Sequence, residues 1–144
     1  MSQQHATAIA IDGVGVLIRG PSASGKSDLA LRLIEAGGIL IADDQVEVAR
    51  VDDRCLLSAP ETINGLLEVR GLGVVDIGAV QDIPLGLVID LKPRDKIERM
   101  PEPKEELIEG ISIRVLDIDA FEMSAPAKIK MALRIQGGRA SLIE

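Results

Sequence analysis

The chain has 144 residues, 47% of them hydrophobic, which suits one compact domain and excludes a segment that is disordered through low hydrophobicity. Its net charge of −7 argues against a nucleic-acid partner, because binding a phosphate backbone needs clustered lysine and arginine. Phe121 is the single aromatic residue among Phe, Tyr and Trp, which excludes a multi-ring platform for single-stranded nucleic acid.

The first third of the chain predicts strand, glycine-rich loop, helix and strand in that order. Residues 8–19 are typical of two short β-branched strands with glycines between them. After the loop, residues 28–36 repeat apolar side chains at spacings of three and four, which indicates a short amphipathic helix. The apolar run 39–42 then predicts a buried strand, and two aspartates follow it directly.

The remaining two thirds predict more strands than helices. In chain order we expect a β-hairpin over 46–58, strands around a glycine-rich bend over 66–77, a strand over 85–91, a loop over 93–103, a short helix over 104–109, a strand over 112–118 and a helix over 126–135. We therefore predict a single α/β domain over residues 1–144, with a mixed β-sheet and one βαβ unit at its front.

The loop between the first strands and the first helix carries the most specific signal. Residues 20–27 read GPSASGKS and fit G-x-x-x-x-G-K-[ST], the phosphate-binding loop (P-loop) of nucleoside-triphosphate enzymes. Its predicted place between strand and helix would direct backbone N–H groups and the helix dipole at phosphates. The residues expected to bind nucleotide are Gly20, Pro21, Ser22, Ala23, Ser24, Gly25, Lys26 and Ser27. Lys26 would reach the β- and γ-phosphates and Ser27 would ligate Mg²⁺, whereas the plain alternative is a flexible glycine-rich turn.

Two sets of carboxylates compete for the remaining chemistry. Asp90 closes an apolar run, as the Mg²⁺-binding aspartate of many P-loop proteins does. Asp43 and Asp44 also end a buried strand, and a βαβ unit would place them beside the loop at the carboxyl edge of the sheet. Such a pair can divide the work, one aspartate as base and the other as metal ligand or orienting group. The plain alternative for the pair is a solvated turn.

Other polar residues have ordinary explanations when each is taken alone. His5 near the terminus, Glu68 on an alternating strand and Arg99 in a polar loop all fit exposed positions. Cys55 alternates with apolar neighbours and is expected in the core. One cysteine and one histidine can form neither an internal disulfide nor a Cys/His zinc site. No leader or membrane-spanning run is visible, so we expect a cytoplasmic protein that does not enter a membrane.

Taken together, residues 5–44 and the segment LLEVRGLGVV over 66–75 resemble the HPr kinase/phosphorylase family in its C-terminal catalytic domain. Histidine, P-loop, paired aspartates and EVRGLG follow one another in the family's order and spacing. The resemblance implies the mixed-sheet P-loop fold of that domain and a short form without the family's N-terminal domain. It also implies a serine kinase that uses ATP and Mg²⁺ and acts on the phosphocarrier protein HPr or an HPr-like carrier.

The resemblance assigns roles position by position. His5 matches an active-site histidine, Lys26 the P-loop lysine and Asp43 the acid/base aspartate, and Arg99 matches an active-site arginine. Ser27 and Glu68 match the Mg²⁺ ligands, which moves the metal role from Asp90 to Glu68.

Two further expectations come from the family. It implies a homo-oligomer, a hexamer in the family. The family's late loop bears arginine and glycine and is tied to dephosphorylation, but the matching stretch 117–127 has neither residue, which argues against phosphorylase activity.

Two other function classes stay open. One is a regulatory module that senses ATP and binds a partner without transferring phosphate; the intact Lys26, Ser27, Asp43, Asp44 and Glu68 favour the enzyme over it. The other is a small-molecule kinase of the general P-loop type, against which the EVRGLG segment speaks.

Overall fold

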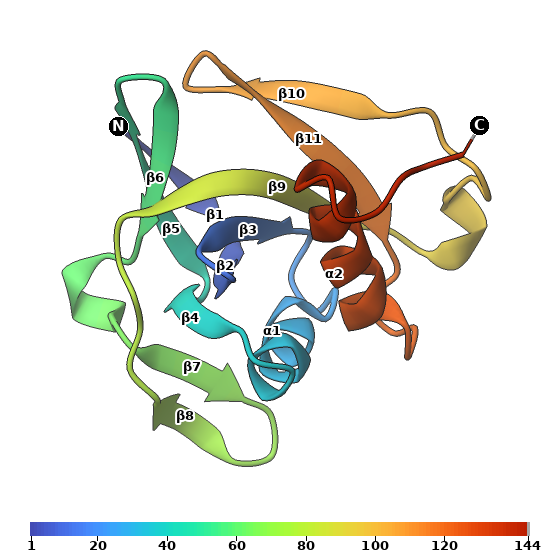
Figure 1. Ribbon diagram of the computed structural model, residues 1–144. Helices are drawn as coiled ribbons and strands as arrows, with labels where there is room; N and C mark the ends of the chain where they lie inside the picture. The colour runs from blue at the N-terminus through green and yellow to red at the C-terminus, as the bar shows by residue number, and fades with distance from the viewer. Residues whose placement is uncertain (144) are drawn as a thin grey trace.

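Nine strands of residues 1–143, the part of the chain that the computed structural model describes, form one curled mixed sheet (Figure 1). The strands of this sheet and of a separate two-stranded hairpin are β1 (Ser2–His5), β2 (Thr7–Ile11), β3 (Val14–Arg19), β4 (Ile39–Ala42), β5 (Gln45–Val51), β6 (Arg54–Ser58), β7 (Leu66–Val69), β8 (Gly73–Asp76), β9 (Ile83–Leu91), β10 (Lys104–Ile108) and β11 (Ile111–Ile118). The helices are α1 (Lys26–Glu35), α2 (Ala125–Gln136) and the short 3₁₀ turns η1 (Glu61–Ile63) and η2 (Arg94–Lys96).

The middle of the sheet sets the direction of the strands that position the site. β3, β9 and β11 are parallel neighbours, so their carboxyl ends meet at one edge. β2 lies between β3 and β4 and pairs antiparallel with both, so β3 and β4 run in the same direction with α1 connecting them. The predicted βαβ unit is therefore present, with β2 inserted between its two strands.

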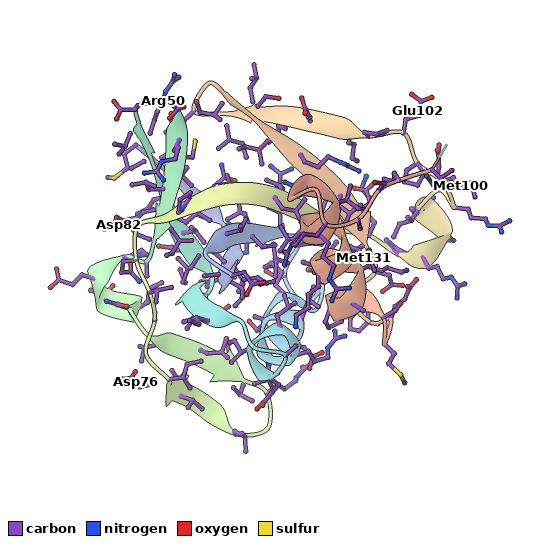
Figure 2. The ribbon with its side chains drawn as sticks, in the orientation of Figure 1. Arg50, Asp76, Asp82, Met100, Glu102 and Met131 are labelled. Atoms are coloured by element: carbon purple, nitrogen blue, oxygen red, sulfur yellow. The ribbon has the colours of Figure 1, made fainter. Side chains whose placement is uncertain are left out.

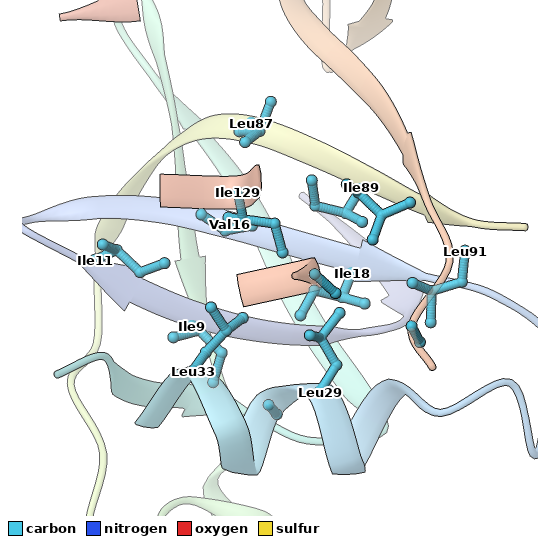
Figure 3. Packing of buried hydrophobic residues seen from close by; sticks show 14 of the residues in the cluster. Ile9, Ile11, Val16, Ile18, Leu29, Leu33, Leu87, Ile89, Leu91 and Ile129 are labelled. Atoms are coloured by element: carbon cyan, nitrogen blue, oxygen red, sulfur yellow. The ribbon is translucent and has the colours of Figure 1, made fainter. Parts of the chain in front are cut away.

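The larger core lies between the middle strands and the two helices (Figure 3). Ile9 and Ile18 project from β2 and β3 toward Leu29 and Leu33 of α1, and Ile129 of α2 joins them. Successive side chains of a strand point to opposite faces of the sheet, so every second one faces the helices. Helix α1 contributes side chains four positions apart, which lie on one face of the helix. Full burial of each such side chain stabilises the fold by about 1.5–3 kcal/mol.

A second core lies on the other face, where the sheet curls over itself. Leu17 and Val88 from the middle strands meet Val48 and Leu57 of the β5–β6 hairpin. Cys55 is buried in this layer, which confirms the expectation of a core cysteine. Both faces of the middle strands are thus covered, which explains their nearly continuous hydrophobic sequences.

Two elements differ from the sequence-based expectation. The predicted helix over 104–109 is wrong: residues 104–108 form β10, which pairs antiparallel with β11. Glu109 and Gly110 both have positive φ (49° and 78°) and close a tight hairpin, which outweighs the helix propensity of Lys, Glu and Leu. The polar strand β1, which no hydrophobic pattern announced, pairs with β5. The other predicted strands and helices are confirmed within a few residues.

No helix of residues 1–143 is long and apolar enough to cross a membrane.

Candidate active site

The loop 20–25 connects the end of β3 to the start of α1, the position that the phosphate-binding motif predicts for it. Gly25 has a φ of 94°, and a Cβ built on it would lie 3.0 Å from Ala120 Cβ and 3.3 Å from Phe121 Cζ. Only glycine satisfies both the left-handed conformation and this close approach. Ser24 Oγ is buried and has no hydrogen-bond partner among the described residues, so the loop holds an unused polar group.

Lys26 is the first residue of α1, and its side chain bends back along the loop. Its Nζ donates hydrogen bonds to the carbonyl oxygens of Gly20 at 2.7 Å and Pro21 at 3.0 Å. Lys26 is only 8% exposed, which is unusual for lysine and reflects these two bonds. The ammonium group is therefore held inside the loop that the motif predicted.

Asp43 follows β4 and accepts hydrogen bonds from three separate elements. Its Oδ1 accepts from Thr7 Oγ1 and from Ser27 Oγ, each at 2.9 Å, and its Oδ2 accepts from the backbone N–H of Glu68 at 3.2 Å. Asp43 is 8% exposed, so the plain alternative of a solvated turn is wrong for it. β2, α1 and β7 meet at this one carboxylate.

Asp44 and His5 form an exposed pair beside the buried Asp43. The backbone of Asp44 turns at a φ of 74°, which separates its side chain from that of Asp43. His5 at the end of β1 places Nδ1 3.5 Å from Asp44 Oδ1. The structure thus brings the predicted histidine to the second aspartate rather than to the first.

Glu68 lies on β7, in the hairpin that β7 forms with β8 beside α1 (Figure 1). Its backbone N–H is bonded to Asp43, while its side chain is exposed. The two positions matched to Mg²⁺ ligands therefore both contact the Asp43 carboxylate, Ser27 through its hydroxyl and Glu68 through its backbone N–H. No group of three or more His, Cys, Asp or Glu side chains that could hold a metal by themselves occurs in residues 1–143.

Arg99 is the one predicted catalytic residue that the structure does not bring to this cluster. It lies in the exposed segment after η2, whose neighbouring Met100 and Glu102 point outward (Figure 2). Within residues 1–143 its side chain forms no hydrogen bond or ion pair with the other site residues.

Asp90, the rival metal ligand from the sequence pattern, is occupied elsewhere. Arg19, directly before the P-loop, donates two hydrogen bonds to Asp90, at 2.8 and 3.0 Å, and two to Glu106. Hydrogen bonds to Glu106 and Asp90 raise the pKa of Arg19, and the same bond to Arg19 lowers the pKa of Glu106. Asp90 follows Val88 by two positions, so it shares the face of the second core and not that of the helices. The ion pair between Arg19 and Asp90 links β3 to β9 directly before the P-loop.

Sequence reasoning missed two residues of this region. Thr7 was a detectable signal, because it is a polar residue in a strand whose other members are all buried and apolar. Arg19 carried no such signal, because its partners lie 71 and 87 positions away and depend on the register of three strands.

Comparison with known proteins adds an independent observation. A family model described as the HPr Serine kinase C-terminal domain matches residues 1–129. The chain is 38% identical over 135 residues to the HPr kinase/phosphorylase of Geobacillus thermodenitrificans and covers 42% of it, with 86% of this chain aligned. It is 36% identical over 142 residues to the HPr kinase/phosphorylase of Lactiplantibacillus plantarum and covers 43% of that protein, with 91% of this chain aligned. The chain therefore spans about two fifths of the length of these curated relatives.

A solved structure is similar over nearly its whole length. The Hpr(Ser) kinase/phosphatase from Coxiella burnetii superposes with a TM-score of 0.85 at 27% identity, covering 96% of this chain and 98% of that one. The mixed-sheet fold expected from the resemblance is confirmed by this match.

Proposed function

The chain belongs to the HPr serine kinase C-terminal domain family, and from this premise we propose that it transfers the γ-phosphoryl group of ATP to a serine hydroxyl of HPr or an HPr-like carrier. The observation that supports this best is the convergence of the P-loop serine, the β7 backbone and Thr7 on the buried Asp43. We also propose that residues 1–144 form a single P-loop serine kinase catalytic domain.

Phosphate binding would use the loop backbone and Lys26. The loop leads into the N-terminus of α1, where N–H groups without helical partners and the helix dipole favour anions. Lys26 Nζ now bonds two neutral carbonyl oxygens, whereas a phosphate oxygen carries negative charge and would attract the ammonium group more strongly. The exchange therefore favours the phosphate, and the Ser24 hydroxyl, which has no hydrogen-bond partner within residues 1–143, offers one further donor.

The oxygen groups present fit Mg²⁺. Mg²⁺ typically takes one or two protein oxygens together with substrate phosphates and water. Ser27 Oγ donates its proton to Asp43 and keeps its lone pairs, and the Glu68 carboxylate is exposed on β7, where the Glu68 backbone N–H bonds the same Asp43. These two residues, with Asp44 as a further candidate ligand, would hold the ion. When bound, Mg²⁺ offsets negative charge on the phosphoryl oxygens.

Asp43 would receive the substrate proton. A carboxylate has about four acceptor positions, and three are used by Thr7, Ser27 and the Glu68 backbone. The remaining position is on Oδ2, fixed in direction by the other bonds. In the proposed step the serine oxygen bonds to the γ-phosphorus, the bond from that phosphorus to the bridging oxygen of ADP breaks, and the hydroxyl proton passes to Asp43. Positioning matters most in such a loose transition state.

The other expected features remain proposals. His5 would orient Asp44 through their 3.5 Å contact. Arg99 would act at the phosphoryl group when its exposed segment folds over the site, as the family resemblance implies. Oligomerisation to a hexamer and a lack of phosphorylase activity are proposals of the same kind.

The test is phosphorylation of the HPr-type carrier from the same source. Wild type, Lys26→Ala and Asp43→Ala are incubated with carrier and Mg·ATP, and intact mass and phosphosite mapping follow. Asp53→Ala is the matched control, because Asp53 is an exposed aspartate in the β5–β6 turn. We expect one phosphate on a carrier serine with wild type and the control, and little or none with the two site variants.

A different outcome would identify the competing function. If ATP binds and Lys26→Ala abolishes the binding, yet no phosphate reaches any carrier serine, the protein is an ATP-sensing module. Transfer at wild-type rate by Asp43→Ala would exclude Asp43 as the proton acceptor.

A further inference from the structure

A cavity of about 280 Å³ lies beside the P-loop, at the carboxyl ends of three parallel strands. Its walls come from the last residue of β9 and from the segments that follow β3, β9 and β11, among them Pro21, Ser24, Leu91, Pro93, Ala120 and Phe121. Lys92 and Asp119 complete the lining with charged groups. In open α/β sheets ligands bind at this edge, and the volume is near the lower end of the roughly 300–1,000 Å³ found for small-molecule sites.

Phe121 lies outside both hydrophobic cores. It is the only Phe, Tyr or Trp of the chain, and the buried residues of both cores are aliphatic apart from Cys55. Phe121 is 73% exposed, yet its ring approaches the P-loop closely at Gly25. A ring with an open face beside a phosphate-binding loop suits stacking against a flat heterocycle.

The loop that carries Phe121 is held in place by polar bonds on several sides. Asp119 Oδ1 accepts from the Phe121 backbone N–H at 2.9 Å, and Asp119 Oδ2 accepts from the Arg94 N–H at 3.2 Å, which joins both rims of the cavity. Arg32 of α1 donates to the carbonyl oxygens of Ala120 and Glu122. The cavity wall is therefore built before any ligand arrives, which lowers the entropic cost of binding.

We propose that this cavity binds the base and ribose of the nucleotide, with Phe121 stacking on the base while the neighbouring P-loop holds the phosphates. The proposal rests on the proposed function, since it requires a nucleoside triphosphate in the loop. The cavity adds to the proposed function a specific binding site for the nucleoside. Pro21 and Ser24 belong to both the P-loop and the cavity, so a ligand can occupy the two without a gap.

The test compares two ligands that share their phosphates. Binding of Mg·ATP and of Mg·tripolyphosphate is measured by calorimetry for wild type, Phe121→Ala and Phe121→Leu. Met123→Ala is the matched control, because Met123 is in the same loop, is 97% exposed and does not line the cavity. Stacking on an aromatic ring is worth about 1–3 kcal/mol per base, so we expect Phe121→Ala to weaken ATP about 5- to 150-fold, near the lower value for an exposed ring. Tripolyphosphate affinity should not change.

Wild-type protein provides a second measurement that no folding defect can disturb. With one Phe and no Tyr or Trp, the ring signals of ¹³C-labelled Phe121 are isolated in an NMR spectrum. We expect ATP to shift them and tripolyphosphate to leave them in place.

Three results would contradict the proposed nucleoside site at Phe121. Equal weakening of ATP and tripolyphosphate by Phe121→Ala would mean that the ring acts on the loop and not on the base. Equal affinity of wild type for both ligands would mean that the nucleoside binds nowhere, while phosphate binding and the proposed function survive. If wild type binds neither ligand, both this site and the proposed function fall.

Discussion

Replacing Thr7 by valine tests whether the bonds at Asp43 stabilise the whole fold. Thr7 is fully buried and donates to Asp43 Oδ1 at 2.9 Å, and valine keeps its shape while removing the donor. A hydrogen bond to a charged group contributes about 1.5–3 kcal/mol, so Thr7→Val should lower the free energy of unfolding by about that amount. For a domain of this length each kcal/mol corresponds to roughly 2–4 °C, which gives a drop in Tm of about 3–12 °C.

Guanidinium unfolding without nucleotide measures the effect directly. Thr62→Val is the matched control, because Thr62 is the exposed threonine of η1 and its change should stay within about 0.5 kcal/mol. A double-mutant cycle with Asp43→Ala isolates the bond itself: in that background Thr7→Val should cost nearly nothing. If the two costs simply add, the bond does not stabilise the fold and the reasoning is refuted.

Three further predictions follow from other parts of the structure. Lys26→Ala should slow phosphotransfer to the carrier more than Asp43→Ala, because electrostatic positioning dominates a loose transition state; the reverse order of rates would contradict this. Leu33→Ala, at a buried position of α1, should cost about 2–5 kcal/mol in denaturant unfolding, against under about 0.5 for the exposed Leu107→Ala. The hydrogen bond from Arg19 lowers the pKa of Glu106 in the folded protein. Ionised Glu106 therefore stabilises the fold at pH values above its unfolded pKa near 4.3, and this stabilisation is lost as the pH falls through the lower pKa of the folded state. Glu106→Gln should therefore reduce stability at pH 7, and its difference from wild type in urea midpoint should shrink toward pH 3; a constant difference would rule this out.

Local patterns were enough to predict the parts of the site that lie close together in sequence. The P-loop motif contains its own glycines, lysine and serine, and the aspartates follow a strand whose burial its apolar residues announce. The contacts across the chain were not accessible in this way. Thr7 reaches Asp43 over 36 positions, and only the antiparallel pairing of β2 with β4 brings them together.

The wrong helix over 104–109 has the same physical origin. Lys, Glu and Leu favour a helix when only neighbours along the chain are considered. β10 instead gains ladder bonds to β11, and Glu106 gains an ion pair with Arg19 from a strand far away in sequence. Edge strands rich in charged residues are hard to identify from sequence because their pairing, and not burial, determines them.

The bond between Ser27 and Asp43 connects the two halves of the proposed chemistry. Ser27 can donate its proton to Asp43 and still offer its oxygen lone pairs to a cation, so the metal ligand and the proton acceptor are held by one another. Removing the hydroxyl in Ser27→Ala should then weaken metal-dependent nucleotide binding and also release Asp43 Oδ1 from one of its two donors. Ser27→Thr keeps the hydroxyl and should preserve both. A loss confined to metal dependence in Ser27→Ala, with transfer at saturating Mg²⁺ unchanged, would show that the two halves work independently.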